Sequence, residues 1–147
     1  MILNYQVTII MKKLQEKYQS DLKFIKKSFL IAELSDDNKT KVGAYIVKDN
    51  VVLSRGYNHS VGVKRKNKND NMLHAEIDAI VKAYNLLEGG TLYCTLHPCI
   101  ECAKAIISAG INRVVYSDDI KKHKEYTIKA KELFKKAKIK VDKVTNR

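Results

Sequence analysis

Apolar residues recur at helical spacing in four parts of the chain, each bounded by polar or turn-forming residues. The predicted helices start at Asp21, near Leu73, at Pro98 and near Glu125. Ser20 is expected to be the N-cap of the first helix, which runs to about Leu34. In the second helix, one apolar face is expected to contain Leu73, Ile77, Ile80, Val81 and Tyr84. Gly89-Gly90 and Gly110 are expected to end the second and third helices.

Short runs rich in β-branched and aromatic residues lie between these helices. The predicted strands cover residues 42–47, 51–55, 91–95, 113–116 and 139–141. Asp49-Asn50 joins the first two strands and favours the tight turn of a β-hairpin. After the hairpin, strands alternate with helices, and strands joined by a crossing helix pair in parallel.

This order predicts an α/β fold: a three-layer α/β/α domain with a mixed five-stranded sheet whose last two strands are parallel. No internal repeat or Pro/Gly-rich linker divides the chain, so residues 20–147 are expected to form a single domain. Residues 1–19 form an N-terminal extension that fits a short strand, a helix or a loosely docked segment equally well.

The chain is strongly basic, with a net charge of +12 from 28 basic and 16 acidic residues. Such a charge raises the question of a nucleic-acid partner. Only four of the cations are Arg, the side chain best shaped for bidentate phosphate and base contacts. The charge therefore favours surface lysines and the steering of a small phosphorylated substrate, with nucleic acid as the less favoured alternative.

Hydropathy gives no sign of a membrane protein. No apolar run approaches the roughly 20 residues that span a bilayer. Lys12 and Lys13 follow the apolar start of the chain, whereas a secretory signal carries its basic residues in front. A cytoplasmic location and no membrane partner are expected.

Two short motifs at predicted helix starts carry the candidate chemistry. His74-Ala75-Glu76 opens one helix, and Pro98-Cys99-Ile100-Glu101-Cys102 opens the next. Cys99 and Cys102 are three residues apart, so both sulfurs lie on the same face of the first turn. One imidazole and two thiolates neutralise Zn²⁺ and leave its fourth tetrahedral position for water, which is the pattern of a catalytic site.

Glu76 is expected to be the proton carrier, because it lies two residues from His74 and is poorly placed as a further ligand. The two motifs together match the H-x-E…P-C-x-x-C signature of zinc deaminases. A structural site remains an alternative, with His97 or Cys94 as a fourth ligand. In that case the chain would be a non-catalytic zinc-containing binding module.

From Val42 to about Val144 the sequence resembles the deoxycytidylate (dCMP) deaminase branch of the cytidine/deoxycytidylate zinc deaminase superfamily. The matching segments are residues 42–47, Gly56-Tyr-Asn58, residues 74–80, residues 91–104, and Ala109-Gly-Ile-Asn-Arg-Val-Val-Tyr116 with the following Ser117-Asp-Asp-Ile120. Cys-Ala-Lys after the second cysteine ligand is closer to deoxycytidylate deaminases than to tRNA adenosine deaminases.

The resemblance implies roles for particular residues. His74, Cys99 and Cys102 match the zinc ligands, and Glu76 matches the proton shuttle. Further residues match substrate contacts: Asn58 for the sugar hydroxyl, the carbonyl of Ala75 for the amino group of the base, and Val42, Gly43, Ala44 and Tyr116 for the walls around the pyrimidine. Relatives of this kind are usually dimers or larger assemblies, so a homo-oligomer is expected.

Two departures from the family pattern concern the phosphate of the substrate. The segment between Asn58 and His74 is shorter than usual, and Leu34-Ser35 stands where the family tends to have an Arg. Phosphate binding is therefore assigned to a basic loop that contains Lys64, Arg65, Lys66 and Lys68.

The expected reaction is the hydrolytic deamination of a cytosine nucleotide, most readily dCMP, to the uracil form and ammonia. The activated water adds to C4, and Glu76 takes its proton and then protonates N3 and the leaving ammonia. The alternatives are a deaminase acting on a free base or nucleoside, or on a base within tRNA or single-stranded nucleic acid.

Overall fold

The computed structural model describes residues 2–62 and 71–146. Four helices are present in these ranges: α1 (Ile2–Ala32), α2 (Ala75–Val81), α3 (Ile100–Ser108) and α4 (Lys124–Lys136). The strands are β1 (Gly43–Lys48), β2 (Val51–Tyr57), β3 (His59–Ser60), β4 (Met72–Leu73), β5 (Thr91–Leu96), β6 (Arg113–Asp118) and β7 (Lys140–Lys143). None of the helices in the described ranges is long and apolar enough to cross a membrane.

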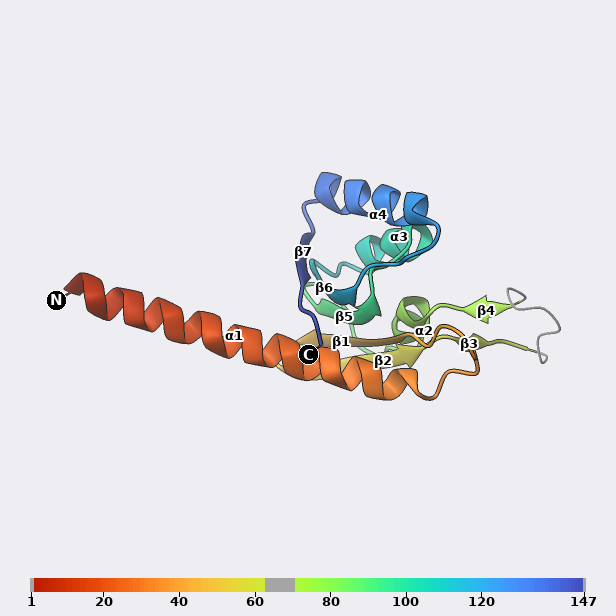
Figure 1. Cartoon of the computed structure of the whole chain (residues 1–147), viewed down its shortest axis with the longest axis horizontal. Coiled ribbons are helices and arrows are strands. Elements are labelled where there is room, and N and C mark those ends of the chain that lie inside the picture. The colour runs from red at the N-terminus through yellow and green to blue at the C-terminus, as the bar shows by residue number, and fades with distance from the viewer. Residues whose placement is uncertain (1, 63–70, 147) are drawn as a thin grey trace.

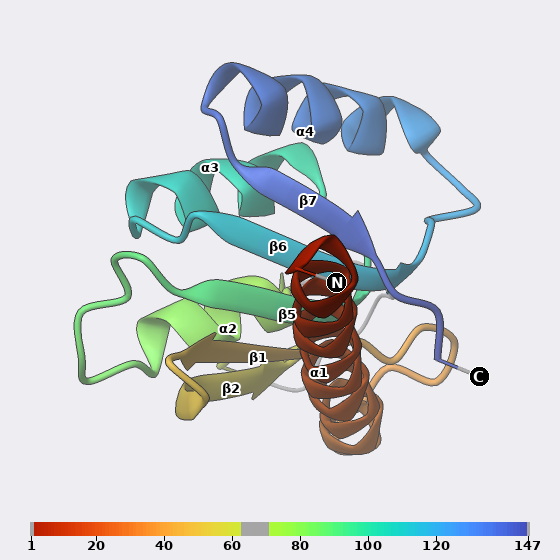
Figure 2. The same ribbon diagram turned by 90° about the vertical axis from the view of Figure 1, so that its left-hand side faces the viewer.

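Five strands form the central sheet in the order β2-β1-β5-β6-β7 (Figures 1 and 2). Strand β1 is antiparallel to both β2 and β5, whereas β5, β6 and β7 are mutually parallel. The predicted mixed five-stranded sheet with its last two strands parallel is therefore confirmed. Asp49 and Asn50 both have positive φ, as the predicted tight hairpin turn requires.

Helices cover both faces of the sheet, which gives the predicted three layers. Successive strand residues point to opposite faces, so Tyr45 and Tyr93 pack against α1, while Ala44 and Leu92 pack against the other helices. Helix α1 covers one face, and α2, α3 and α4 cover the other (Figure 2).

Helix α1 begins much earlier than its predicted start. It runs unbroken from Ile2, so the prediction of Ser20 as an N-cap is wrong. Residues 2–19 contain no Gly or Pro to interrupt the helix, and all of them are exposed. This part projects well beyond the sheet, whereas the second half of the helix packs on it (Figure 1).

Helix α2 is shorter than predicted, because it ends at Val81. As a result Val81 and Tyr84 are exposed rather than on its buried face. Leu87, in the segment that leads to β5, fills the core instead. The short pair β3–β4, which the sequence analysis did not predict, joins the ends of the segment between β2 and α2.

A buried ion pair fastens α1 to the sheet where the helix leaves it. Arg113 on β6 donates to both carboxylate oxygens of Asp21 at 2.8 Å. Tyr93 donates its hydroxyl to the same carboxylate, and Asp142 on β7 accepts from Arg113. The Asp21 carboxylate is thereby fully paired although only 4% of the residue is exposed.

Arg113→Met is expected to lower the free energy of unfolding by about 3 kcal/mol, because it leaves the Asp21 carboxylate buried without its cation. Urea denaturation followed by circular dichroism measures this loss. The control is Lys104→Met, which removes an exposed ion pair with Glu101 and should change stability by less than about 0.5 kcal/mol. Equal losses in the two variants would contradict this account of α1.

Candidate active site

His74 and Cys99 stand at the starts of α2 and α3, each in extended conformation as the N-cap residue. Neither side chain caps its own helix, so both are available for other partners. The backbone continues each helix normally: Asp78 N–H donates to the His74 carbonyl, and Ala103 N–H to that of Cys99. The two motifs singled out in the sequence therefore fold as two helix starts, as predicted.

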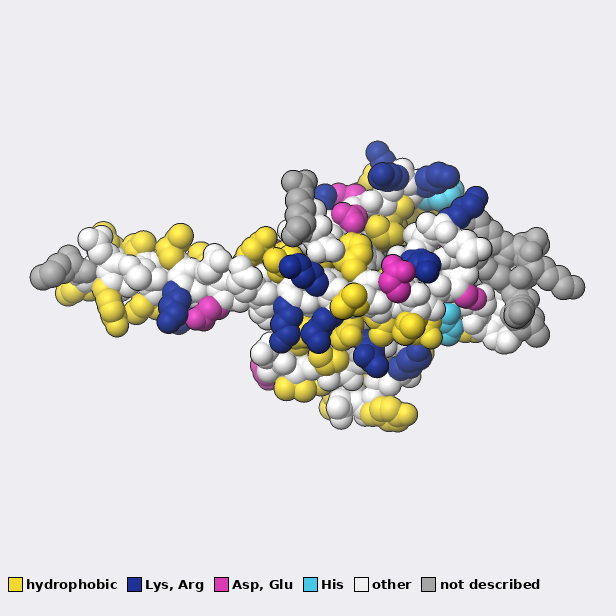
Figure 3. All heavy atoms as spheres, turned by 60° about the horizontal axis from the view of Figure 1, so that its bottom comes forward, with side chains coloured by type: hydrophobic (Ala, Val, Ile, Leu, Met, Phe, Trp, Pro, Cys, Tyr) yellow, Lys and Arg dark blue, Asp and Glu magenta, His cyan; other side chains and the backbone are white. Residues whose placement is uncertain are grey.

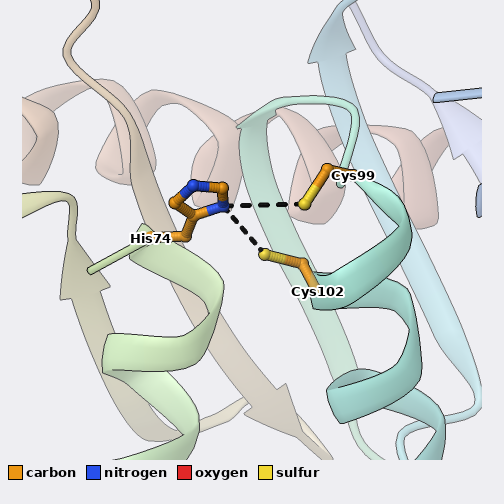
Figure 4. Close-up of side chains that lie close together, drawn as sticks. All are labelled: His74, Cys99 and Cys102. Carbon is orange, nitrogen blue, oxygen red and sulfur yellow. Dashed lines mark hydrogen bonds between the residues drawn. The ribbon is translucent and has the colours of Figure 1, made fainter. Parts of the chain in front are cut away.

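The imidazole of His74 faces both sulfurs across the gap between the two helices (Figure 4). Its Nδ1 lies 3.3 Å from Cys102 Sγ and 3.6 Å from Cys99 Sγ. The three ligand atoms all lie within 4.8 Å of one another, close enough to hold one metal ion.

The two sulfurs differ in their affinity for a proton. A hydrogen bond from Cys102 lowers the pKa of Cys99 to about 4, and that same bond, with burial, raises the pKa of Cys102. A hydrogen bond to Cys99 likewise raises the pKa of His74. A divalent cation binds both sulfurs as thiolates and so stabilises the Cys102 thiolate, which burial alone disfavours.

Glu76 lies beside this group and is almost completely buried, with 4% of the residue exposed. Its Oε2 accepts a hydrogen bond from Cys102 Sγ at 3.0 Å. Burial raises the pKa of Glu76, which brings the carboxyl group closer to the range in which it can both take and release a proton near neutral pH.

The candidate fourth ligands do not belong to this group. Among the described residues, the cluster that could hold a metal consists of His74, Cys99 and Cys102. The Cys94 thiol is buried and lies 3.7 Å from the Val115 carbonyl, and His97 Nδ1 lies 2.8 Å from the Pro98 carbonyl. Within residues 2–62 and 71–146, this set of one imidazole and two sulfurs without a further protein ligand fits a catalytic zinc ion better than a structural one.

A cavity of about 580 Å³ opens beside His74, Glu76 and Cys99. Three predicted substrate contacts, Val42, Asn58 and Ala75, line it. The other predicted wall residues lie in different surroundings. Gly43 lies against the Ser28 carbonyl of α1, Ala44 is in the core, and Tyr116 packs edge-on against His97.

The cavity has nine further lining residues, of which Leu96, His97 and Ile120 lie in the family-matching segments: Asp37, Thr40, Met72, Leu96, His97, Ile120, Lys122, His123 and Tyr126. The segment between β6 and α4 supplies three of them, including two exposed basic side chains at the opening. A basic pair in a short connection is a weak sequence signal, and the sequence analysis missed it. The predicted phosphate loop, Lys64, Arg65, Lys66 and Lys68, lies outside the described residues.

Asn58 is held firmly on the wall of this cavity. Its Oδ1 accepts from Val42 N–H and its Nδ2 donates to the Thr40 carbonyl, both at 2.8 Å. A carboxamide offers two donors and two acceptor sites, so one of each remains for a ligand.

The arrangement agrees with comparisons to known proteins. Residues 18–118 match the family model of the cytidine and deoxycytidylate deaminase zinc-binding region. The chain is 36% identical to the ComE operon protein 2 of Bacillus subtilis, over 82% of this chain and 69% of that protein. It is 34% identical to the deoxycytidylate deaminase of Mus musculus, over 83% of this chain and 78% of that enzyme.

Solved structures show the same similarity. The dCMP deaminase of cyanophage S-TIM5, in complex with dCMP and dUMP, superposes with a TM-score of 0.71 and 27% identity. The match covers 89% of this chain and 96% of the phage enzyme. Other matched proteins are named as deaminases of a diaminopyrimidine and of tRNA adenosine. With its family match, its fold and its His/Cys/Cys group, this chain belongs to the cytidine and deoxycytidylate deaminase family of zinc-dependent enzymes.

Proposed function

We propose that the chain deaminates a cytosine nucleotide, with dCMP as its substrate, to give the uracil nucleotide and ammonia. The observation that carries the proposal is the buried Glu76 carboxyl group next to a His/Cys/Cys group at the edge of a cavity. Relatives named as deoxycytidylate deaminases, and the phage structure with dCMP and dUMP, support the choice of substrate.

His74, Cys99 and Cys102 would hold the zinc ion, which supplies a Lewis acid that makes a water molecule a nucleophile near neutral pH. Glu76 takes the proton of this water and passes it to N3 of the ring, while the water oxygen forms a bond to C4. Glu76 then takes the proton of the hydroxyl group formed on C4 and gives it to the amino nitrogen, so that the C4–N bond breaks, ammonia leaves and C4 becomes a carbonyl carbon. The raised pKa of Glu76 suits both directions of transfer.

The rest of the cavity would orient the nucleotide. The Ala75 carbonyl is expected to accept from the amino group of the base, and the free donor and acceptor of Asn58 to bind the sugar hydroxyl. Lys122 and His123 at the opening complement the charge of a 5′-phosphate, as does the predicted loop with Lys64, Arg65, Lys66 and Lys68. Two basic segments would then share phosphate recognition.

Oligomer formation is part of the proposal, through the projecting half of α1. Leu3, Val7, Ile10 and Leu14 lie about five turns before Asp21, Ile25, Ser28 and Ala32, so they continue the face that packs on the sheet. Their alternating spacing of four and three residues is typical of helices that pack on one another. Figure 3 shows apolar side chains along this projecting helix.

A second copy of the chain is the partner that fits this stripe. With Met11 and Tyr18, the stripe exposes roughly 600 Å² of side chain, which approaches the ~800 Å² per partner of a standard interface. Antiparallel pairing places Lys12-Lys13 beside the uncharged first turns of the other helix, whereas parallel pairing would bring four lysines together. The antiparallel arrangement is therefore proposed.

Glu76→Gln is expected to keep one zinc per chain and to lower kcat for dCMP by at least about 10³-fold, since the amide cannot carry the proton. Ammonia release and elemental analysis measure the two quantities. Glu101→Gln is the matched control, because this carboxylate is exposed, lies next to Cys102 and should be dispensable for both. Loss of zinc from Glu76→Gln would instead identify Glu76 as a ligand or structural residue.

Lys122→Met is expected to raise KM for dCMP about 10-fold and to leave KM for deoxycytidine within about twofold, because only the nucleotide carries a phosphate. The same assay with CMP, cytosine, single-stranded DNA and tRNA identifies the substrate class. Substitution of Lys64, Arg65, Lys66 and Lys68 by Ala tests the loop in the same way. Faster turnover of tRNA or single-stranded DNA than of dCMP by the wild-type protein would overturn the substrate proposal.

The double variant Ile10→Glu/Leu14→Glu is expected to convert an oligomer into a monomer, because two carboxylates cannot be buried in the apolar stripe. Light scattering after size-exclusion chromatography gives the mass. Thr8→Glu/Gln15→Glu adds the same charge off the stripe and should leave the mass unchanged. A wild-type protein that is monomeric at all concentrations refutes the proposed helix pairing.

A further inference from the structure

A buried carboxylate on α2, that of Asp78, collects hydrogen bonds from three directions. Only 1% of this residue is exposed. Its Oδ2 accepts from the backbone N–H of Tyr57 at 3.1 Å and from Lys82 Nζ at 2.8 Å. Its Oδ1 lies 2.9 Å from His59 Nε2. This cluster does not touch the cavity, and the reaction described above makes no use of it.

Two of the three donors are the chain neighbours of Asn58, on either side of the proposed substrate contact. Tyr57 ends β2, and His59 begins β3, so Asn58 lies between two residues that are tied to the same carboxylate. The carboxamide of Asn58 is fixed separately by Val42 and Thr40. The Asn58 N–H also donates to the Val42 carbonyl at 3.1 Å, and Asp78 holds the chain on both sides of Asn58 through Tyr57 and His59.

The carboxylate also belongs to the helix that carries the reacting group. Asp78 lies on α2 two residues after Glu76, and its own N–H donates to the His74 carbonyl at 2.9 Å. Gly56 brings β2 close to this helix, because a Cβ at this position would collide with the backbone at Ala75 and Ala79. The cluster therefore links the strand that leads into Asn58 to the helix of Glu76 and the metal ligand His74.

Charge strengthens the link. Burial alone would raise the pKa of Asp78, but hydrogen bonds from Lys82 and His59 keep this pKa below its usual value. The bond to Asp78 in turn raises the pKa of His59. Lys82 lies 5.0 Å from the centre of the Tyr57 ring, which lies 5.2 Å from that of His59. The cluster thus consists of the ionised Asp78 carboxylate, the Lys82 ammonium group, the His59 imidazole and the Tyr57 ring.

We propose that Asp78 is a positioning residue for the reaction, because it holds Asn58 at a fixed place relative to Glu76. The sugar hydroxyl can then bind to Asn58 while the reacting ring carbon of the same nucleotide lies beside Glu76. Asp78 acts on the substrate through Asn58 and does not touch it. This inference rests on the proposed function, because it takes the sugar contact of Asn58 from there.

The test compares dCMP with 2′,3′-dideoxycytidine monophosphate, which lacks the hydroxyl that Asn58 is proposed to bind. The wild-type protein should prefer dCMP in kcat/KM by about 10-fold, the usual effect of one hydrogen bond. Asp78→Asn removes the charge and turns an amide N–H₂ toward at least one donor. It should raise KM for dCMP while zinc content stays the same, and reduce the preference to less than about twofold.

A merely structural role of Asp78 would not change this ratio, because a partly unfolded enzyme loses activity toward both nucleotides equally. Asp142→Asn is the matched control: this carboxylate pairs with Arg113 away from the cavity and should keep the full preference. In an Asn58→Ala background, Asp78→Asn should have no further effect on the ratio, since residues that act through one contact are not additive.

The outcomes separate the two levels of inference. If the wild-type protein turns over both nucleotides equally well, the sugar contact of the proposed function is wrong. If the wild-type protein prefers dCMP over the dideoxy nucleotide and the Asp78→Asn variant shows the same preference, the positioning role is overturned. His59→Gln provides the second measurement, because His59 is partly exposed and its loss leaves two donors on Asp78. An unchanged ratio in this variant, too, overturns the proposal.

Discussion

The active site depends on the close meeting of two helix starts beside the end of β5, the middle strand of the sheet. Neither helix alone supplies a metal site: α2 is preceded by one imidazole, and α3 contributes two sulfurs three residues apart. The parallel connection through α3 and the antiparallel pairing of β1 with β5 bring the two starts together. Gly56 contributes by allowing β2 to approach the backbone of α2. The metal ligands lie in two local sequence motifs, whereas the arrangement of the whole sheet brings these motifs together.

The same place concentrates groups that are costly to bury. Burial raises the pKa of the Glu76 carboxyl group and contributes to the raised pKa of the Cys102 thiol. Such groups destabilise a folded chain, and they are typically found where function requires them. By contrast, the buried charges of Asp21 and Asp78 are each paired with at least one cation, as expected of groups that stabilise structure.

Much of this molecule could be predicted from its sequence because the relevant signals are local. The metal ligands and Glu76 lie in two short motifs at helix starts, and the alternation of strands and helices gives the layers and the parallel pairing. Two errors also have local causes. Ser20-Asp21 looks like a helix start, yet Asp21 pairs with Arg113, which is far away in the sequence, and nothing before it breaks the helix. Val81 and Tyr84 continue a helical pattern after the helix has ended.

The remaining features could not be predicted, because they depend on contacts between distant segments. His59 and Asp78 belong to no motif together, and only the fold shows that Asp78 binds the residues on both sides of Asn58. Lys122 and His123 reach the cavity through the connection after β6, where they follow the last family-matching segment. Local motifs therefore identify the reacting groups and some substrate contacts, such as Asn58 and Ala75, while the groups that position Asn58 and the basic pair in the cavity lining are found only in the folded structure.

X-ray absorption at the zinc edge of the purified protein tests the central claim most directly. The account predicts that the nearest neighbours of the metal are two sulfur atoms, one imidazole nitrogen and one light atom that does not come from the protein. A third sulfur from Cys94 or a second imidazole from His97 would contradict it, because the metal would then have no position for a reacting water molecule.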